Sequence, residues 1–333
     1  MKTKIKIGIC AGIILIIAAG AAIYNFTTKT KTPEYALKIV EESFANHDRE
    51  SFYKHVDLKG ILQTSYDGII EGMTYTNKSM TDDARESVKE FTEMLRAPML
   101  LSLESSIDSY VATGDFHEED NVGVSELLKR TGMDKSIYRG VGEVVENDSQ
   151  ATADILIYHP ELGREFSLKF VLQRDDSDVW KIIRVENFKD FITQINQVRR
   201  QKLDDYLKQS AEIISRHDKN IADAVQKYNA VAGAGSLAQE NTRSQLKDLM
   251  TNTFKKDWEA RKVELLKLTV PQDAATLQNL RLKICDLEIS YAEGYAKWMD
   301  DKNAATVKAA EEQHRQAQTL ILEEKTLTRR MVD

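Results

Sequence analysis

The sequence predicts an α+β fold: an N-terminal transmembrane helix, helices packed on a curved antiparallel four-stranded sheet, and then a mainly antiparallel α-helical bundle. Three observations lead to this prediction. Residues 7–26 are uncharged, residues 138–187 alternate apolar with polar side chains, and the chain beyond residue 187 carries apolar side chains at helical spacing. The expected parts are a basic segment (1–6), a transmembrane or signal-anchor helix (7–26), a stalk (27–32), an α+β domain (33–187) and a helical bundle (188–333).

Residues 7–26 fit a membrane-spanning helix, because a helix of this length spans about 30 Å, the thickness of a bilayer core. Lys2, Lys4 and Lys6 precede the segment. Their positive charge predicts a cytoplasmic N-terminus and places all later domains outside the cytoplasm. Cleavage after Ala21 is the alternative, since Ala19-Gly20-Ala21 fits a signal-peptidase site, and it would give a secreted protein.

Composition argues against several functional classes. The 333 residues carry a net charge of -7 without a basic cluster, so a nucleic-acid partner is not expected. The two cysteines, Cys10 and Cys285, lie far apart and give no disulfide framework. Neither a nucleophile elbow nor a phosphate-binding glycine loop occurs, so we expect no enzyme activity, no cofactor and no metal.

Helices come first in the predicted α+β domain. Thr32 is a suitable N-cap and Pro33 suits the first helical position, so a helix is expected to begin there. Asp57 is expected to cap a further helix that starts at Leu58. A longer helical run covers residues 81–111, and Pro98 should kink or split it.

Four strands follow the helices. Gly140 and Gly142 predict a bulge in the first strand. The strands are expected at 138–147, 151–159, 164–174 and 179–186, with turns at 160–163 and 175–178. Helices followed by an antiparallel meander are typical of an α+β domain whose helices cover one face of the sheet.

Four stretches of this domain carry a resemblance to a known type of protein. They are Thr32 to Leu37, His47-Asp48, Phe52 to Asp57, and Val179 to Asn187, where the last reads Val-Trp-Lys-Ile-Ile-Arg-Val-Glu-Asn. Residues 32–190 resemble bacterial membrane-anchored proteins of unknown function that contain a cystatin-like or nuclear-transport-factor-2-like α+β domain. The resemblance implies an extracytoplasmic domain with a pocket or a docking surface, and it does not imply an enzyme.

The remaining chain is predicted to be helical. Asn187 is expected to cap a helix over residues 188–228, whose first turns should pack on the sheet. Further helices are expected at 237–266, after Pro271, and at 304–330. In the third of these four helices, Leu277, Ile284, Tyr291 and Trp298 repeat every seven residues, which is coiled-coil spacing, and the short connections make neighbouring helices antiparallel.

Seven residues are candidates for pocket or partner contacts. Titratable side chains could gather in a pocket between the helices and the sheet, and aromatic side chains could line a groove in the bundle; ordinary core packing is the alternative for both groups. The first group is His55, Asp154 and His159, and the second is Trp258, Tyr291, Tyr295 and Trp298. His217 and His314 occupy inward stripes of their helices, either as a pH-sensitive pair or as two unrelated core histidines.

The sequence therefore leads us to expect a non-enzymatic, single-pass membrane-anchored binding or scaffold protein of the bacterial cell envelope. Its expected partners are the lipid bilayer, through residues 7–26, and a protein of the envelope, with a homodimer as a further option. One alternative is a small-molecule-binding or enzymatic module that uses a pocket between the helices and the sheet. The other alternative is the cleaved, secreted protein.

Overall fold

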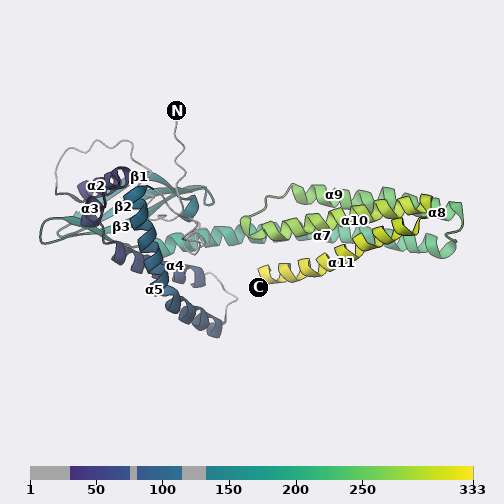
Figure 1. Cartoon of the computed structure of the whole chain (residues 1–333), viewed down its shortest axis with the longest axis horizontal. Coiled ribbons are helices and arrows are strands. Elements are labelled where there is room, and N and C mark those ends of the chain that lie inside the picture. Colours follow the sequence, from purple (N-terminus) through teal and green to yellow (C-terminus); the bar gives the residue numbers. More distant parts are fainter. Residues whose placement is uncertain (1–30, 76–80, 115–132, 333) are drawn as a thin grey trace, which may run out of the picture. The chain divides into compact units, whose positions relative to one another are not determined.

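The computed structural model describes residues 31–75, 81–114 and 133–332, which belong to two compact units, Met1–Val198 and Arg199–Asp333 (Figure 1). The predicted membrane segment, residues 7–26, lies outside the described residues. Within the described ranges, no helix is both long enough and apolar enough to span a bilayer.

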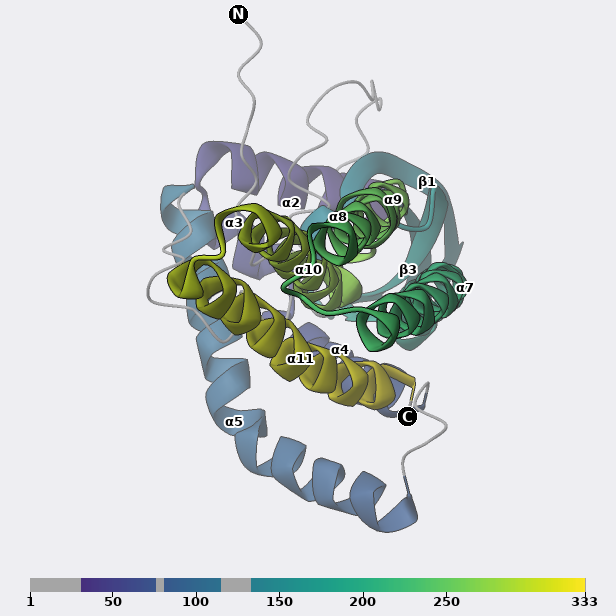
Figure 2. The same cartoon turned by 90° about the vertical axis from the view of Figure 1, so that its right-hand side faces the viewer.

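The described part of the first unit begins with helices, as predicted. They are α2 (Pro33–Asn46), α3 (Arg49–His55), α4 (Leu58–Tyr75) and α5 (Asp82–Thr113). Thr32 caps α2 by accepting a hydrogen bond from the backbone N–H of Tyr35, and Pro33 occupies the first turn. Asp57 accepts a hydrogen bond from the N–H of Gly60 and so caps α4. Helix α5 is continuous through Pro98, and Figure 2 shows that it bends, so the expected kink is present but the expected split is not.

Four antiparallel strands form one sheet in the order β1-β2-β3-β4. They are β1 (Ile137–Asn147), β2 (Gln150–His159), β3 (Arg164–Arg174) and β4 (Trp180–Val185). The register of β1 against β2 shifts at Gly140 and again between Val141 and Val144, which confirms the predicted bulge. Alternate residues of β2, such as Ile155 and Ile157, are fully buried, so one face of the sheet carries the core.

Side chains from the helices and the sheet share one core in this unit. Leu37, Phe52 and Trp180 are among its members. Helix α7 (Phe188–Ala234) begins here, and its Phe188 and Phe191 belong to the same core. The prediction that the first turns of this helix pack on the sheet is confirmed.

The predicted capping role of Asn187 is wrong. Its side-chain oxygen accepts a hydrogen bond from the N–H of Lys169 at 2.8 Å, and its amide nitrogen donates to the carbonyl of Ser167 at 2.8 Å. Both partners lie in the part of β3 that extends past the end of the shorter β4. The side chain of Asn187 therefore forms the hydrogen bonds with the β3 backbone that the backbone of β4 would otherwise form.

The second unit is a bundle of helices, seen end-on in Figure 2. Besides the later part of α7 it contains α8 (Glu240–Leu249), α9 (Lys256–Leu266), α10 (Ala275–Asp301) and α11 (Ala304–Val332). A π-helical turn, Met250–Lys255, separates α8 from α9 where the sequence predicted one regular helix. Apolar side chains form three successive clusters along the bundle, which include Leu277, Ile284 and Ala292 of α10.

Candidate functional site

A cavity of about 300 Å³ lies in the first unit, called the α+β unit below because it contains the sheet and helices α2 to α5. Its walls come from the residues around the start of α2, from α3 and from the start of β4. The polar residues on these walls include Lys31, Tyr35, Lys54 and His55. This cavity is the candidate functional site, and of the sequence-predicted residues only His55 lines it.

The ring of His55 is held in one orientation. The side chain is 8% exposed, and Nδ1 lies 2.9 Å from the carbonyl oxygen of Trp180. Since a carbonyl can only accept, Nδ1 carries the proton. Burial lowers the pKa of His55, so the ring is neutral at pH 7 and its Nε2 is a hydrogen-bond acceptor.

The rim of the cavity is charged. Lys31 and Asp178 form an ion pair of 2.9 Å, and both side chains are more than half exposed. This interaction lowers the pKa of the Asp178 carboxyl. Lys54, an exposed residue of α3, adds a second positive charge to the wall.

The other titratable candidates of this unit lie elsewhere. His159 is buried at the far end of β2, where its ring contacts that of Phe191 at 6.0 Å. The strand register places Trp180 near Gln150, so His159 is nine residues, or roughly 30 Å, away along β2. Asp154 lies on the opposite face of the sheet from the buried Ile155. Among the described residues, His55 is therefore the one buried titratable side chain on the cavity walls, and it has no second buried titratable group beside it.

The aromatic candidates of the bundle separate into two clusters. Trp258 packs with Leu265 and Ile284, and the guanidinium of Arg261 lies 4.6 Å from its ring. Tyr295 contacts the rings of Tyr291 at 5.7 Å and Trp298 at 5.1 Å. Trp258 therefore belongs to a different cluster from the other three residues, which all lie in α10. Tyr291 and Tyr295 pack against the apolar cluster that contains Met250 and Ala292, whereas Trp298 contacts Tyr295 of its own helix.

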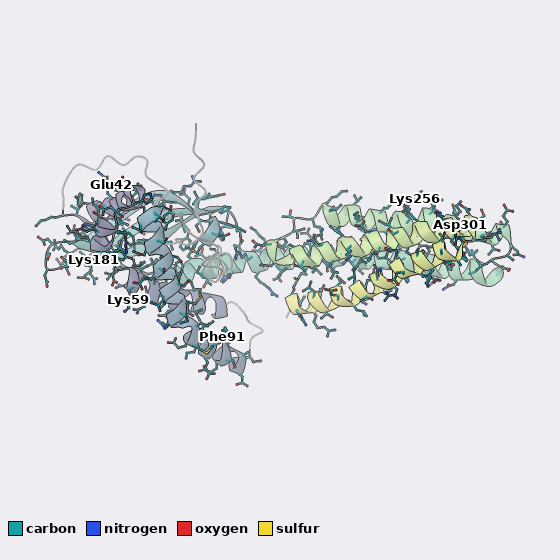
Figure 3. The ribbon with its side chains drawn as sticks, viewed as in Figure 1. Glu42, Lys59, Phe91, Lys181, Lys256 and Asp301 are labelled. Carbon is teal, nitrogen blue, oxygen red and sulfur yellow. The ribbon has the colours of Figure 1, made fainter. Side chains whose placement is uncertain are left out.

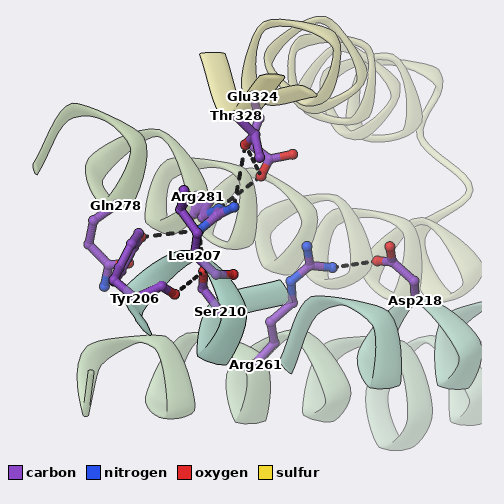
Figure 4. A network of polar contacts seen from close by, with 9 residues as sticks. All are labelled: Tyr206, Leu207, Ser210, Asp218, Arg261, Gln278, Arg281, Glu324 and Thr328. Carbon is purple, nitrogen blue, oxygen red and sulfur yellow. Dashed lines mark hydrogen bonds and ion pairs between the residues drawn. The ribbon is translucent and has the colours of Figure 1, made fainter. Parts of the chain in front are cut away.

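A buried polar network connects three helices of the bundle (Figure 4). Arg281 of α10 is 3% exposed, and its Nε donates to Glu324 of α11 at 2.8 Å. Its Nη1 donates to Ser210 at 2.7 Å and to Tyr206 at 3.2 Å, and both of these residues lie in α7. The sequence pattern did not predict this network. A charged residue inside an apolar helical repeat is the only signal that could have indicated it.

The two bundle histidines contact different carboxylates and do not form a pair. Buried His217 lies between Asp257, at 2.9 Å from Nδ1, and Glu264, at 3.4 Å from Nε2. His314 lies 3.0 Å from Glu288, and this hydrogen bond raises the pKa of His314. Each histidine therefore forms its own polar contact between neighbouring helices.

No group of three or more metal-binding side chains occurs in the described part of the chain. Comparison with protein-family models, with curated proteins and with solved structures finds no match.

Proposed function

We propose that this protein is a non-enzymatic, single-pass membrane-anchored binding or scaffold protein of the bacterial cell envelope. The uncharged residues 7–26 and the lysines before them support an anchor with a cytoplasmic N-terminus. The two described units would then lie outside the cytoplasm. In the bundle, buried Arg281 and His217 are bonded to carboxylates of neighbouring helices, which supports a structural rather than a catalytic use of these groups.

The observation that carries a binding role is an exposed apolar face on α5. Phe91 is 56% exposed, and Met94 and Leu101 are each 67% exposed. Phe91 is labelled on this helix in Figure 3. The three side chains recur after three and then seven residues, so they share one side of the helix. A continuous apolar face on a surface helix is typical of an interaction site.

We assign this face to a second copy of the chain. Between the large apolar side chains lie Ala97 and Pro98, which are small enough for two helices to approach closely at that point. In an antiparallel pair centred there, Met94 of one copy would face Leu101 of the other, as a two-fold axis requires. Membrane anchoring would raise the local concentration and support a contact of this small size.

The distribution of charge favours the antiparallel arrangement. Residues 82–93 of α5 contain five carboxylates and two basic side chains, whereas residues 97–103 carry no charge. An antiparallel pair places each acidic half over an uncharged half, while a parallel pair would bring the acidic halves together. The same carboxylates disfavour insertion of this face into an anionic bilayer.

Cysteine crosslinking of the full chain in membranes tests the arrangement. The experiment uses a Cys10→Ala background; Cys285 is buried, and burial raises its pKa to about 11, so it stays unreactive. Ala97→Cys, near the proposed two-fold axis, should give a disulfide-linked dimer under mild oxidation. Ser87→Cys, ten residues away on α5, should not.

Absence of the Ala97→Cys dimer, or equal crosslinking of both variants, would contradict the proposal. If the Ala97→Cys variant stays monomeric, the face does not contact a second copy.

Separate experiments address the anchor. Protease treatment of spheroplasts should digest both units, and the intact mass of the mature chain should exclude cleavage after Ala21.

A small-molecule-binding role of the α+β unit is the second candidate function. The cavity beside His55 favours it, because pockets that hold small ligands have volumes from about 300 Å³ upward.

A further inference from the structure

We propose that the cavity beside His55 binds a small organic anion, namely a short-chain carboxylate with an apolar tail. This inference rests on the second candidate function and specifies the ligand class. It is independent of the apolar face of α5, which lies on other residues, so either proposal can fail without the other.

Hydrogen-bond donors outnumber acceptors on the cavity walls. Lys54 projects from α3 and has no ion pair within the described part of the chain. Thr32 uses its oxygen to accept from the backbone of Tyr35, so its hydroxyl proton is available to donate. Asp178, the only carboxylate among the described lining residues, forms an ion pair with Lys31.

Trp180 adds a buried donor. The side chain is 1% exposed, and its indole Nε1 has no hydrogen-bond partner among the described residues. Buried N–H groups rarely lack an acceptor, and such an orphan donor is typical of a site that receives one from a ligand or solvent. The Nε1 atom itself is covered, and Trp180 lines the cavity; we infer that an oxygen of the bound anion becomes its acceptor.

The positive charge for the anion comes from lysine rather than histidine. The pKa of His55 is lowered by burial, so its ring is neutral and offers only an acceptor. Lys31 is already paired with Asp178. Lys54 is therefore the side chain that balances one negative charge, which matches a monoanion better than a dianion.

Part of the remaining lining is apolar. Ala36 and Ile39 of α2 and Val179 before β4 border the cavity. A short alkyl chain would cover these side chains, and the volume of about 300 Å³ lies at the lower end of the range for ligand pockets, which favours a small ligand. An acid of the size of butyrate satisfies the charge, the donors and the apolar wall together.

The indole N–H resonances give a direct test, since the chain contains three tryptophans. The full chain in micelles is labelled with ¹⁵N-indole tryptophan, the Trp180 signal is assigned with Trp180→Phe, and butyrate, butylamine and inorganic phosphate are titrated. Butyrate should shift the Trp180 signal to saturation and leave those of Trp258 and Trp298 unchanged. Lys54→Gln should weaken this binding about three- to fivefold, as expected for one exposed charge contact.

Lys59→Gln is the matched control, because Lys59 is an exposed lysine of α4 in the same unit and does not line the cavity (Figure 3). Its affinity for butyrate should equal that of the parent. Absence of a saturable shift of the Trp180 signal would overturn the proposal. An equal shift with butylamine, or an equal loss of butyrate affinity in both lysine variants, would also overturn it. An equal response to phosphate would refute the role of the apolar wall.

Discussion

Glu324→Leu is the substitution that tests the buried network of the bundle most directly. Glu324 accepts the hydrogen bond from Nε of Arg281 at 2.8 Å, and the side chains of the two residues are 13% and 3% exposed. Leucine would fill a similar volume but remove the negative charge. The Arg281 guanidinium would then stay buried between helices without a carboxylate.

The expected loss of stability follows from this geometry. Removal of one partner from a buried ion pair typically costs about 3–5 kcal/mol, because the remaining charge is left uncompensated. Arg281 would keep its hydrogen bonds to Tyr206 and Ser210, so we expect the lower limit, about 3 kcal/mol. In the double variant Arg281→Leu/Glu324→Leu both charges are absent. Tyr206 keeps its bond to Gln278, and the stability should return to within about 1 kcal/mol of the parent.

Urea unfolding followed by tryptophan fluorescence measures these differences. Trp180→Phe removes the signal of the α+β unit, so that Trp258 and Trp298 report on the bundle alone. The free energy of unfolding is then compared for the parent, the two single variants and the double variant. A loss below about 1 kcal/mol in Glu324→Leu, or a double variant as unstable as the sum of the single variants, would refute the reasoning.

Two further predictions concern the contact between α10 and α11, and the second has a control substitution in α7. The hydrogen bond to Glu288 raises the pKa of His314 above its unfolded value of 6.5, so its contribution to stability is complete below pH 6.5 and is lost as the pH rises through the folded pKa. The difference in unfolding free energy between the parent and His314→Gln should therefore shrink from pH 6 to pH 8; a difference that grows over this range would refute the assignment. A Cβ at Gly294 would lie 2.9 Å from that of Ala310, so Gly294→Ala should cost about 1–3 kcal/mol through overpacking. Gly233 of α7 has open space around it, and Gly233→Ala should instead stabilise by about 0.5–1 kcal/mol. Thermal unfolding of both variants checks this, and equal effects of the two substitutions would contradict it.

Helix ends and strand positions were predictable where the signal is local. Thr32 and Pro33 predict the start of α2 because an N-cap and its hydrogen bond involve residues only three apart. The period of two in β2 and β3 follows from the burial of one sheet face, and both strands match their predicted bounds to within one residue. The seven-residue repeat in α10 likewise predicts which of its side chains face the other helices.

Much of the candidate site could not be predicted in this way. His55 and Trp180 are separated by 125 residues, and their hydrogen bond depends on the placement of α3 against β4. The sequence grouped His55 with His159 and Asp154 by chemistry, yet strand register and alternation separate the three. The position of Asn187 predicted a helix cap, but its side chain is hydrogen-bonded to the backbone of β3 instead. In each case the partner comes from a distant segment, and local patterns hold no information about it.

The sequence by itself determined the order of the helices and strands. Burial of one face makes apolar side chains recur every two residues in a strand and every 3.6 residues in a helix. It also determined the uncharged segment 7–26 and the net charge. Tertiary structure decided which polar groups meet: His55 with Trp180, Arg281 with Glu324, and His217 with Asp257. The sequence alone does not show whether a polar side chain forms its hydrogen bonds with water or with a buried partner. That depends on how the helices and strands pack, because packing excludes water and brings a particular partner within reach.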